Sequence, residues 1–369
     1  MGTILVFIII LSLLVFVHEL GHFLMAKKMG MKVEEFGFGF PPRLFGLTRG
    51  ETTYSINSIP LGGFVRIKGE SGEHRDHPDS FSSKSALARF GVLVAGVAMN
   101  LLLAAVLLSV GFMIGLPGIV DESLPSSAHV RDRHLMIMNV LADSPAAKAG
   151  IQAGDILLNI DAQTFTTTQQ ARDYIASKAS EPMTVLVEDQ QHVSHQSELV
   201  VQSLPSTGTI GLGVGLVQTG LISYPFLDAV IQGIGQTISL TGEILKAFGG
   251  IVKSLIGGHG VGVDLSGPVG IAVMTGQVAA LGFVYLLQFT ALLSINLAVI
   301  NVLPFPALDG GRILFLLIEK WRGRAVDERV ETAAHNLGFL LLMVLVLLVT
   351  YKDFATYGGE IIKAFQSLT

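Results

Sequence analysis

The chain contains no cysteine, which removes two structural possibilities at once. No disulfide can stabilise it, and no thiolate can bind a metal ion, so a metal site would have to use imidazole, carboxylate or carbonyl groups. Without cysteine, the sequence carries no mark of the redox state of its compartment. The net charge of −5 is too small to favour a nucleic-acid partner, so none is expected.

Charged residues are also scarce. They make up 14% of the 369 residues and hydrophobic residues 50%, whereas a soluble domain has about 25% charged residues. The first apolar stretch has neither a basic segment before it nor a small-residue cleavage pattern after it, so we expect it to be retained. Four stretches are long and apolar enough to cross a bilayer core of about 30 Å, and they lie at about 3–25, 90–116, 283–303 and 335–351.

The distribution of basic residues predicts how the chain crosses the membrane. Lysine and arginine gather between the first two spans and in the short loop at 318–333, whereas the long segment at about 117–282 has few for its length. Cytoplasmic loops carry an excess of Lys and Arg. Both basic loops are therefore expected in the cytoplasm, with 117–282 and the two termini outside it.

The first span ends in His18-Glu19-Leu20-Gly21-His22. Residues four apart lie on one face of a helix, so the two imidazoles can bind one zinc ion while Glu19 lies beside them to move a proton. The alternative is a helix end whose polar residues only meet lipid headgroups. Ionisable groups at membrane depth are costly and usually functional, which favours the metal site.

Two histidines leave a catalytic zinc site one protein ligand short, because such sites usually have three protein ligands and a water. Asp309 is the only acidic residue in the run from Asn301 to Gly311 that ends the third span. The prolines and glycines of this run break the helix at membrane depth, which is tolerated only where the backbone is buried in protein or lines a wet cavity. Asp309 is the candidate third ligand; alternatively, it faces the cytoplasm or pairs with Arg312.

The long external segment begins with a predicted small soluble α/β domain at 120–205. A helical pattern at 168–179 accompanies four short β-type runs, which lie at 136–141, 156–160, 183–187 and 199–204. Farther on, apolar residues from Leu227 to Phe248 recur at helical spacing, which predicts an amphipathic helix on the outer membrane surface. A fifth span is the alternative, although the glycine-rich run with His259 and Asp264 interrupts any long helix.

These patterns divide the chain into four parts. The two halves of the membrane core are expected at 1–119 and 283–369, and the soluble domain and the surface segment at 120–205 and 206–282. Within the first part, strand patterns at 53–58 and 64–67 flank turn residues at 60–63, which predicts a β-hairpin.

Together, the motif around His18 and the run N-x-x-P-x-P-x-L-D-G-G from Asn301 resemble the site-2 protease family of intramembrane zinc metalloproteases, in its bacterial RseP-type form. The resemblance covers nearly the whole chain. The run from Asp143 to Asp161 resembles the PDZ domains of exported proteases, which bind a peptide as an added strand. Some relatives carry two PDZ domains in tandem, whereas this chain has room for one.

The resemblance implies a fold and a site. The fold is a polytopic α-helical membrane protein with about four transmembrane helices, a membrane-associated β-hairpin and one extracytoplasmic PDZ-like α/β domain. The site has Zn²⁺ as cofactor, and the implied roles are His18, His22 and Asp309 as ligands, Glu19 as catalytic base and Asn301 as a substrate contact. In relatives, such a hairpin dips into the membrane beside the active site, where an unpaired edge could hold an extended substrate; the alternative is an ordinary cytoplasmic hairpin. The hairpin residues assigned to substrate binding are Gly62, Gly63, Phe64 and Val65.

The expected activity is zinc-dependent hydrolysis of peptide bonds in or near the transmembrane segment of single-span membrane proteins. The expected setting is the lipid bilayer of a bacterial cytoplasmic (inner) membrane, in regulated intramembrane proteolysis of anti-sigma factors or signal-peptide remnants. A zinc transporter or metal sensor is the first alternative, but it would need neither Glu19 as a base nor a PDZ-like domain. An inactive scaffold is the second, and the intact H-E-x-x-H motif argues against it.

Overall fold

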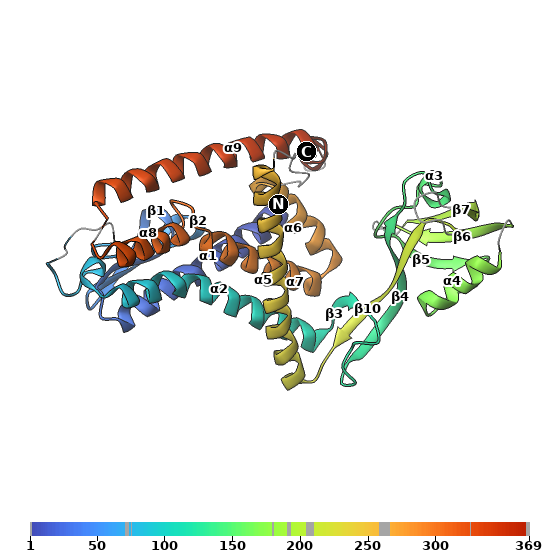
Figure 1. Cartoon of the computed structure of the whole chain (residues 1–369), viewed down its shortest axis with the longest axis horizontal. Helices are drawn as coiled ribbons and strands as arrows, with labels where there is room; N and C mark the ends of the chain where they lie inside the picture. Colours follow the sequence, from blue (N-terminus) through green and yellow to red (C-terminus); the bar gives the residue numbers. More distant parts are fainter. Residues whose placement is uncertain are drawn as a thin grey trace. The chain divides into compact units, whose positions relative to one another are not determined.

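In the computed structural model, the chain forms two compact units (Figure 1). Unit 1 combines Met1–Val110 with Val230–Thr369, and unit 2 is Gly111–Ala229. The described residues are 2–70, 74, 76–178, 181–189, 193–203, 210–257, 266–324 and 326–366.

The four expected membrane spans are confirmed as helices that are long and apolar enough to cross a bilayer. They are α1 (Gly2–Lys28), α2 (Ala86–Ile114), α7 (Phe283–Val302) and the stretch Arg329–Gly359 of α9 (Glu328–Gln366). The last span is longer than the predicted 335–351. Its apolar side chains are largely exposed in the isolated chain, as expected for a helix that faces lipid.

The chain breaks between α7 and α8 (Asp309–Arg322) because the intervening residues cannot continue a helix. Pro304 and Pro306 lack a backbone N–H, and Ala307 has a positive φ of 79°. Gly310 packs directly on the backbone at the end of α7. Only glycine fits there, because an added Cβ would overlap the carbonyl oxygens of Val302 and Leu303. The break therefore folds the first turn of α8 directly against the end of α7.

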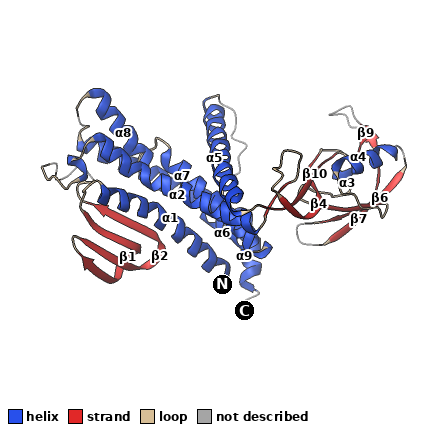
Figure 2. Ribbon diagram, turned by 90° about the horizontal axis from the view of Figure 1, so that it is seen from below, coloured by secondary structure: helices blue, strands red, loops and turns tan. Residues whose placement is uncertain are grey.

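Unit 1 contains a sheet made of β1 (Val33–Arg49) and β2 (Thr52–Ile67), and Figure 2 shows it alongside α1. Both strands bend, so the sheet has four rows, in the order 43–49, 52–57, 33–40 and 63–67. The prediction that 53–58 and 64–67 pair with each other as a hairpin is wrong, because the row 33–40 lies between them. The turn residues at 60–63 instead carry β2 from one side of this central row to the other.

The bend of β2 lies directly on α1. Gly62, with φ of 106°, leaves space that Val15 fills, since an added Cβ would meet the Val15 side chain at 2.6 Å. Gly63 likewise packs close to Phe16. The Ser12 hydroxyl donates to the carbonyl oxygen of Pro60 at 2.5 Å. These contacts place the row 63–67 at the free edge of the sheet, along the helix that carries His18 and His22.

Unit 2 is built on a six-stranded sheet in the order β3-β10-β4-β5-β6-β7. The predicted strands at 156–160 and 183–187 fall in β5 and β6, and that at 136–141 falls in β4 except for its last residue. The predicted helix at 168–179 corresponds to α4 (Thr168–Ser177). The run at 199–204 is divided between β7 and β8 as far as Ser203; Leu204 lies outside the described residues. The bounds are β3 (Leu116–Ile119), β4 (His129–Val140), α3 (Pro145–Lys148), β5 (Ile156–Ile160), β6 (Pro182–Glu188), β7 (Ser194–Val200), β8 (Gln202–Ser203), β9 (Ile210–Gly211) and β10 (Val214–Ser223).

Strand β10 extends the soluble unit beyond the sequence-based boundary at 205. It pairs antiparallel with β4 along most of its length and with β3 at 219–222, so it lies inside the sheet rather than in the predicted surface segment. Leu216 of β10 belongs to the same buried cluster as Leu135, Ile160 and Met183. The unit therefore needs residues on both sides of that boundary to complete its core.

Helix α5 (Phe226–Ile256) is a single helix of 31 residues, as the periodicity from Leu227 predicts. It is not among the four helices apolar enough to span, so its placement on the membrane surface stays a prediction. His259 and Asp264 lie outside the described residues. A shorter apolar helix, α6 (Pro268–Leu281), follows, and the buried Asp353 of α9 accepts hydrogen bonds from the N–H groups of Gly267 and Gly270 at its start.

Candidate metal centre

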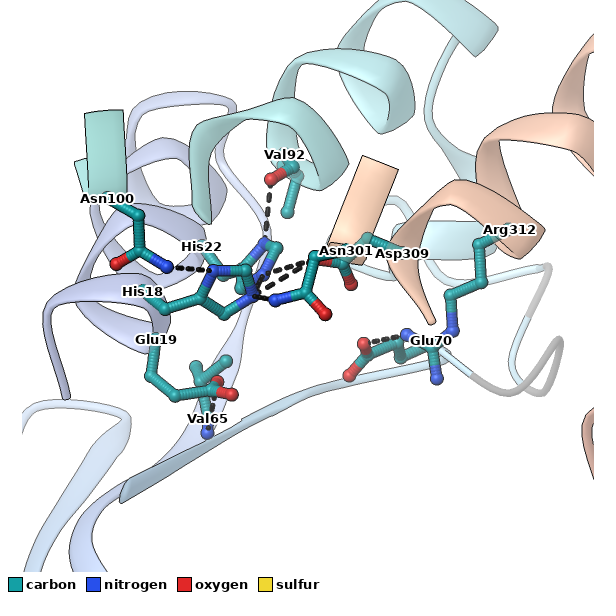
Figure 3. Close-up of polar contacts among 10 residues, drawn as sticks. All are labelled: His18, Glu19, His22, Val65, Glu70, Val92, Asn100, Asn301, Asp309 and Arg312. Carbon is teal, nitrogen blue, oxygen red and sulfur yellow. Dashed lines mark hydrogen bonds and ion pairs between the residues drawn. The ribbon is translucent and has the colours of Figure 1, made fainter. Parts of the chain in front are cut away.

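His18 and His22 lie one turn apart on α1, with their side chains directed to one point (Figure 3). Only 6% of His18 and 7% of His22 is exposed. The two Nε2 atoms are 3.1 Å apart. Helical spacing therefore brings two imidazole nitrogens to one buried position, as the motif predicts.

Asp309, the first residue of α8, completes this cluster. Its Oδ2 lies 3.0 Å from His18 Nε2 and 3.3 Å from His22 Nε2. The alternative of an ion pair between Asp309 and Arg312 is not what the structure shows, because Arg312 pairs with Glu70 in the turn that follows β2. The break between α7 and α8 thus turns the only acidic side chain of its motif toward the histidines.

The three groups fit a tetrahedral metal ion. Bonds to zinc of about 2.0–2.1 Å place two tetrahedral ligand atoms about 3.3 Å apart, close to the three separations observed here. Asp309 Oδ2 is buried and has no hydrogen-bond partner of good geometry among the described residues. His18, His22 and Asp309 together form the metal-ligand cluster found in the described part of the chain.

The second helix packs against both imidazoles through a glycine that sequence analysis did not select. An added Cβ at Gly96 would overlap His22 Nε2 and lie 2.8 Å from His18 Cε1. His22 Nδ1 lies 2.8 Å from the carbonyl oxygen of Val92, one turn earlier on α2. The available signal was Gly96-x-x-x-Asn100, a small and a polar residue on one face of an apolar span.

Glu19 lies beside the cluster and contacts the sheet. Its Oε2 accepts a hydrogen bond from the backbone N–H of Val65 at 3.1 Å. Val65 belongs to the free row 63–67, so the sheet edge and the carboxylate meet next to the metal ligands (Figure 3). This arrangement joins the candidate base to the strand that the sequence assigns to substrate binding.

The other predicted site residues take different positions. Gly62 and Gly63 pack on α1, and the ring of Phe64 lies over Gly37 of the central row. Asn301, near the end of α7, brings its Nδ2 to 3.4 Å from His18 Nε2. The structure therefore gathers Asn301 at the metal cluster and Val65 at Glu19, whereas the two glycines and Phe64 shape the strand.

Two ion pairs attach α8 to its neighbours. Arg312 pairs with Glu70, and Arg89 of α2 forms two hydrogen bonds to Glu319 of α8, at 2.8 and 3.0 Å. A polar pocket lies between these pairs. Because Asp309 begins the same helix, these contacts also fix the position of the candidate third ligand.

Comparisons with known proteins agree with this geometry. Residues 6–345 match the model of Peptidase family M50. A Clostridium perfringens protein, CPE1693, is 36% identical over 343 residues, which is 93% of this chain and 95% of that protein. The zinc metalloprotease RasP of Geobacillus kaustophilus is 31% identical over 432 aligned positions, covering 95% of this chain and 97% of that protein.

Solved structures are similar to a part of the chain. The PDZ domain of the SdrC-like protein Lmo2051 from Listeria monocytogenes is 28% identical and covers 24% of this chain and 92% of that structure, with a TM-score of 0.22. The structure of GtR34C from Geobacillus thermodenitrificans is 33% identical, covering 22% and 94%, with a TM-score of 0.19. From the family match and the full-length relatives, the chain belongs to peptidase family M50 and is a zinc metalloprotease.

Proposed function

We propose that this protease hydrolyses peptide bonds in or next to the transmembrane segment of single-span membrane proteins. The observation that carries the proposal is the position of the ligand cluster. His18 and His22 belong to an apolar helix long enough to span the membrane, and Gly96 of a second such helix packs on them. A peptide bond could meet this cluster only by entering the membrane-embedded unit.

The residues have distinct roles in this reaction. His18, His22 and Asp309 would hold a zinc ion, which supplies polarisation of the scissile carbonyl and a lowered pKa for water when bound. Glu19 accepts the proton of the attacking water and delivers it to the leaving amine. Asn301, within 3.4 Å of His18 Nε2, donates its amide N–H to the substrate carbonyl beside the ligands. No covalent enzyme intermediate is needed.

The free edge of β2 presents the substrate. A transmembrane helix satisfies its own backbone hydrogen bonds, so its peptide bonds are inaccessible until a segment is extended. The row 63–67 pairs with the sheet on one side only, so its other side could pair with such a segment once the Val65 N–H leaves Glu19. Pairing with this edge would compensate the backbone groups that unwinding exposes.

The proposed setting is the bacterial cytoplasmic membrane, with unit 2 and both termini outside the cytoplasm. The excess of Lys and Arg between α1 and α2, and from the last turn of α8 to the start of α9, supports this orientation. On the outer side, α5 would lie on the membrane surface, and the PDZ-like unit would select substrates by binding an extended peptide. Anti-sigma factors and signal-peptide remnants are the substrate classes this arrangement suits.

The test uses the purified full-length protein in detergent with a panel of single-span peptides and a soluble peptide of matched composition. Mass spectrometry should find cuts within or beside the apolar segment, a zinc chelator should abolish them, and added zinc should restore them. Glu19→Gln, measured alongside, controls for a contaminating protease. Cleavage of the soluble peptide alone, or cleavage that survives the chelator, would contradict the proposal.

A further inference from the structure

Asn100 of α2 lies against the imidazole of His18 and has no role in the chemistry described above. It is completely buried, at 0% exposure. Its Nδ2 lies 3.3 Å from His18 Nδ1, on the side of the ring opposite to the metal-binding Nε2 (Figure 3). A polar side chain within an apolar span costs free energy unless its hydrogen bonds are made, so this contact needs an explanation.

His22 shows that a histidine bound to a metal ion through Nε2 needs a hydrogen-bond acceptor at its Nδ1. His22 Nδ1 faces the backbone carbonyl of Val92, which can only accept a hydrogen bond. The ring proton of His22 is therefore held on Nδ1, and the lone pair of Nε2 is free for a metal ion. A second imidazole bound through Nε2 needs an acceptor at its own Nδ1, and Asn100 is the group placed there.

The amide of Asn100 can supply that acceptor. A half turn about its last bond exchanges Oδ1 and Nδ2 and leaves the other atoms in place. Asn100 Oδ1 has no hydrogen-bond partner among the described residues, so no other contact opposes the turn. The backbone is held separately, because the carbonyl of Asn100 accepts from the Ser294 hydroxyl of α7 at 2.8 Å. The amide is thus fixed in position and free in orientation.

We propose that Asn100 is a positioning residue, whose Oδ1 accepts the Nδ1–H of His18 and so holds the ring with Nε2 directed at the metal ion. Gly96, one turn earlier, allows the helix to come close enough for this contact. The inference rests on the proposed zinc site but not on the identity of any substrate. Asn100 touches neither Asp309 nor Glu19 in the hydrogen bonds described, so its effect passes through His18 alone.

Zinc affinity of the full-length protein in detergent, measured by competition with a chelator, tests the proposal. Asn100→Leu keeps the size but removes the acceptor, and it should weaken zinc binding about 10- to 100-fold. Asn100→Asp keeps an acceptor and should stay within a few-fold of the wild type. Ser109→Ala, on the same helix away from the histidines, is the matched control. Equal affinity of Asn100→Leu and wild type, or equal losses in Asn100→Leu and Asn100→Asp, would overturn the proposal.

A second measurement needs no variant that might fail to fold. In zinc-loaded wild-type protein labelled with ¹⁵N-histidine, the His18 ring should carry its proton on Nδ1, seen as a one-bond N–H coupling, and so should the His22 ring. A His18 ring protonated on Nε2 would overturn the inference. These outcomes are independent of cleavage: a protein that binds zinc as described but cuts no transmembrane peptide would contradict only the proposed function.

Discussion

Val65 donates its backbone N–H to Glu19 Oε2 across 3.1 Å, which ties the free edge of the β-sheet to the candidate catalytic base. The same N–H is one that a substrate strand added to this edge would use. A substrate strand bound there, as proposed, would therefore compete with Glu19 for a single donor. Binding of an extended substrate would free the carboxylate to accept a proton from water.

Val65→Pro tests this relationship, because proline has no N–H to give to either partner. A hydrogen bond to a charged group contributes about 1.5–3 kcal/mol, so kcat/KM should fall about 10- to 100-fold. Zinc content should be unchanged, since Val65 supplies no ligand. Leu44→Pro, in the row at the opposite edge of the sheet, controls for the general effect of a proline. Similar cleavage by both proline variants would rule out a special role for the Val65 edge.

Glu19→Gln separates proton transfer from metal binding. The three candidate ligand atoms belong to His18, His22 and Asp309 and not to Glu19, so the variant should bind zinc as the wild type does. Cleavage should fall by a factor of about 10² or more, because the amide cannot accept the proton. Metal analysis and single-turnover cleavage on the same preparation measure both quantities. Near-wild-type cleavage by this variant would refute the assigned base.

Asp309→Ala and Asn301→Ala should differ in their effect on zinc binding, although both should lower cleavage. Removing the carboxylate whose Oδ2 lies 3.0 Å from His18 Nε2 takes away the only anionic ligand, so both zinc affinity and cleavage should be lost. Asn301→Ala should keep the zinc and lower turnover, because its amide is beside the cluster but is not one of the ligands. Chelator competition and kcat distinguish the two. Full zinc occupancy in Asp309→Ala would require another third ligand.

The sequence predicts those parts of the site that depend on residues close together in the chain. The spacing of His18 and His22 follows from helix geometry, and the prolines and glycines before Asp309 predict a broken helix at membrane depth. The four spans follow from apolar length alone. These features fix most of the metal cluster without reference to distant contacts.

The sequence could not predict which distant segments pair as neighbouring strands. The turn residues at 60–63 are typical of a hairpin, but the row 33–40 pairs on both sides and separates 53–58 from 64–67. No local pattern marks that insertion, since strand order depends on the packing of the whole sheet on α1. The sequence gives no reason to assign Asn100 to the site for a related reason: its partner His18 lies 82 positions away.

The hydrogen bonds to the Asp161 carboxylate should make the stability of unit 2 depend on pH. The Thr184 N–H donates to its carboxylate at 2.7 Å and the Tyr174 hydroxyl at 2.9 Å, and these bonds, opposed by burial, hold the pKa of Asp161 below its ordinary value. A depressed pKa in the folded state adds stability above the unfolded pKa, and this contribution disappears as the pH falls through the folded pKa. Amide exchange at Thr184, corrected for the intrinsic rate, should therefore accelerate as acid protonates Asp161.

Asp161→Asn is the control for that measurement. The neutral amide keeps an acceptor for Thr184 but carries no charge, so the variant should be less protected near neutral pH and should lose less protection in acid. Protection that falls equally in both proteins over the same pH range would assign the effect to other carboxyl groups.

Removal of most of unit 2 should leave the chemistry in place, because no described residue of this unit belongs to the metal-ligand cluster. The Val120 N–H donates to the Gln218 carbonyl at 2.8 Å, so a Gly/Ser linker of about four residues can replace 121–217 and still join β3 to the end of β10. Zinc content should match that of the wild type, and a substrate with a short external segment should still be cleaved.

Substrates with bulky external domains should be cut faster by the deleted protein than by the full chain if unit 2 screens them. The same deletion carrying Glu19→Gln controls for background cleavage, and loss of zinc from the deleted protein with its helix content intact would show that unit 2 helps to assemble the metal centre.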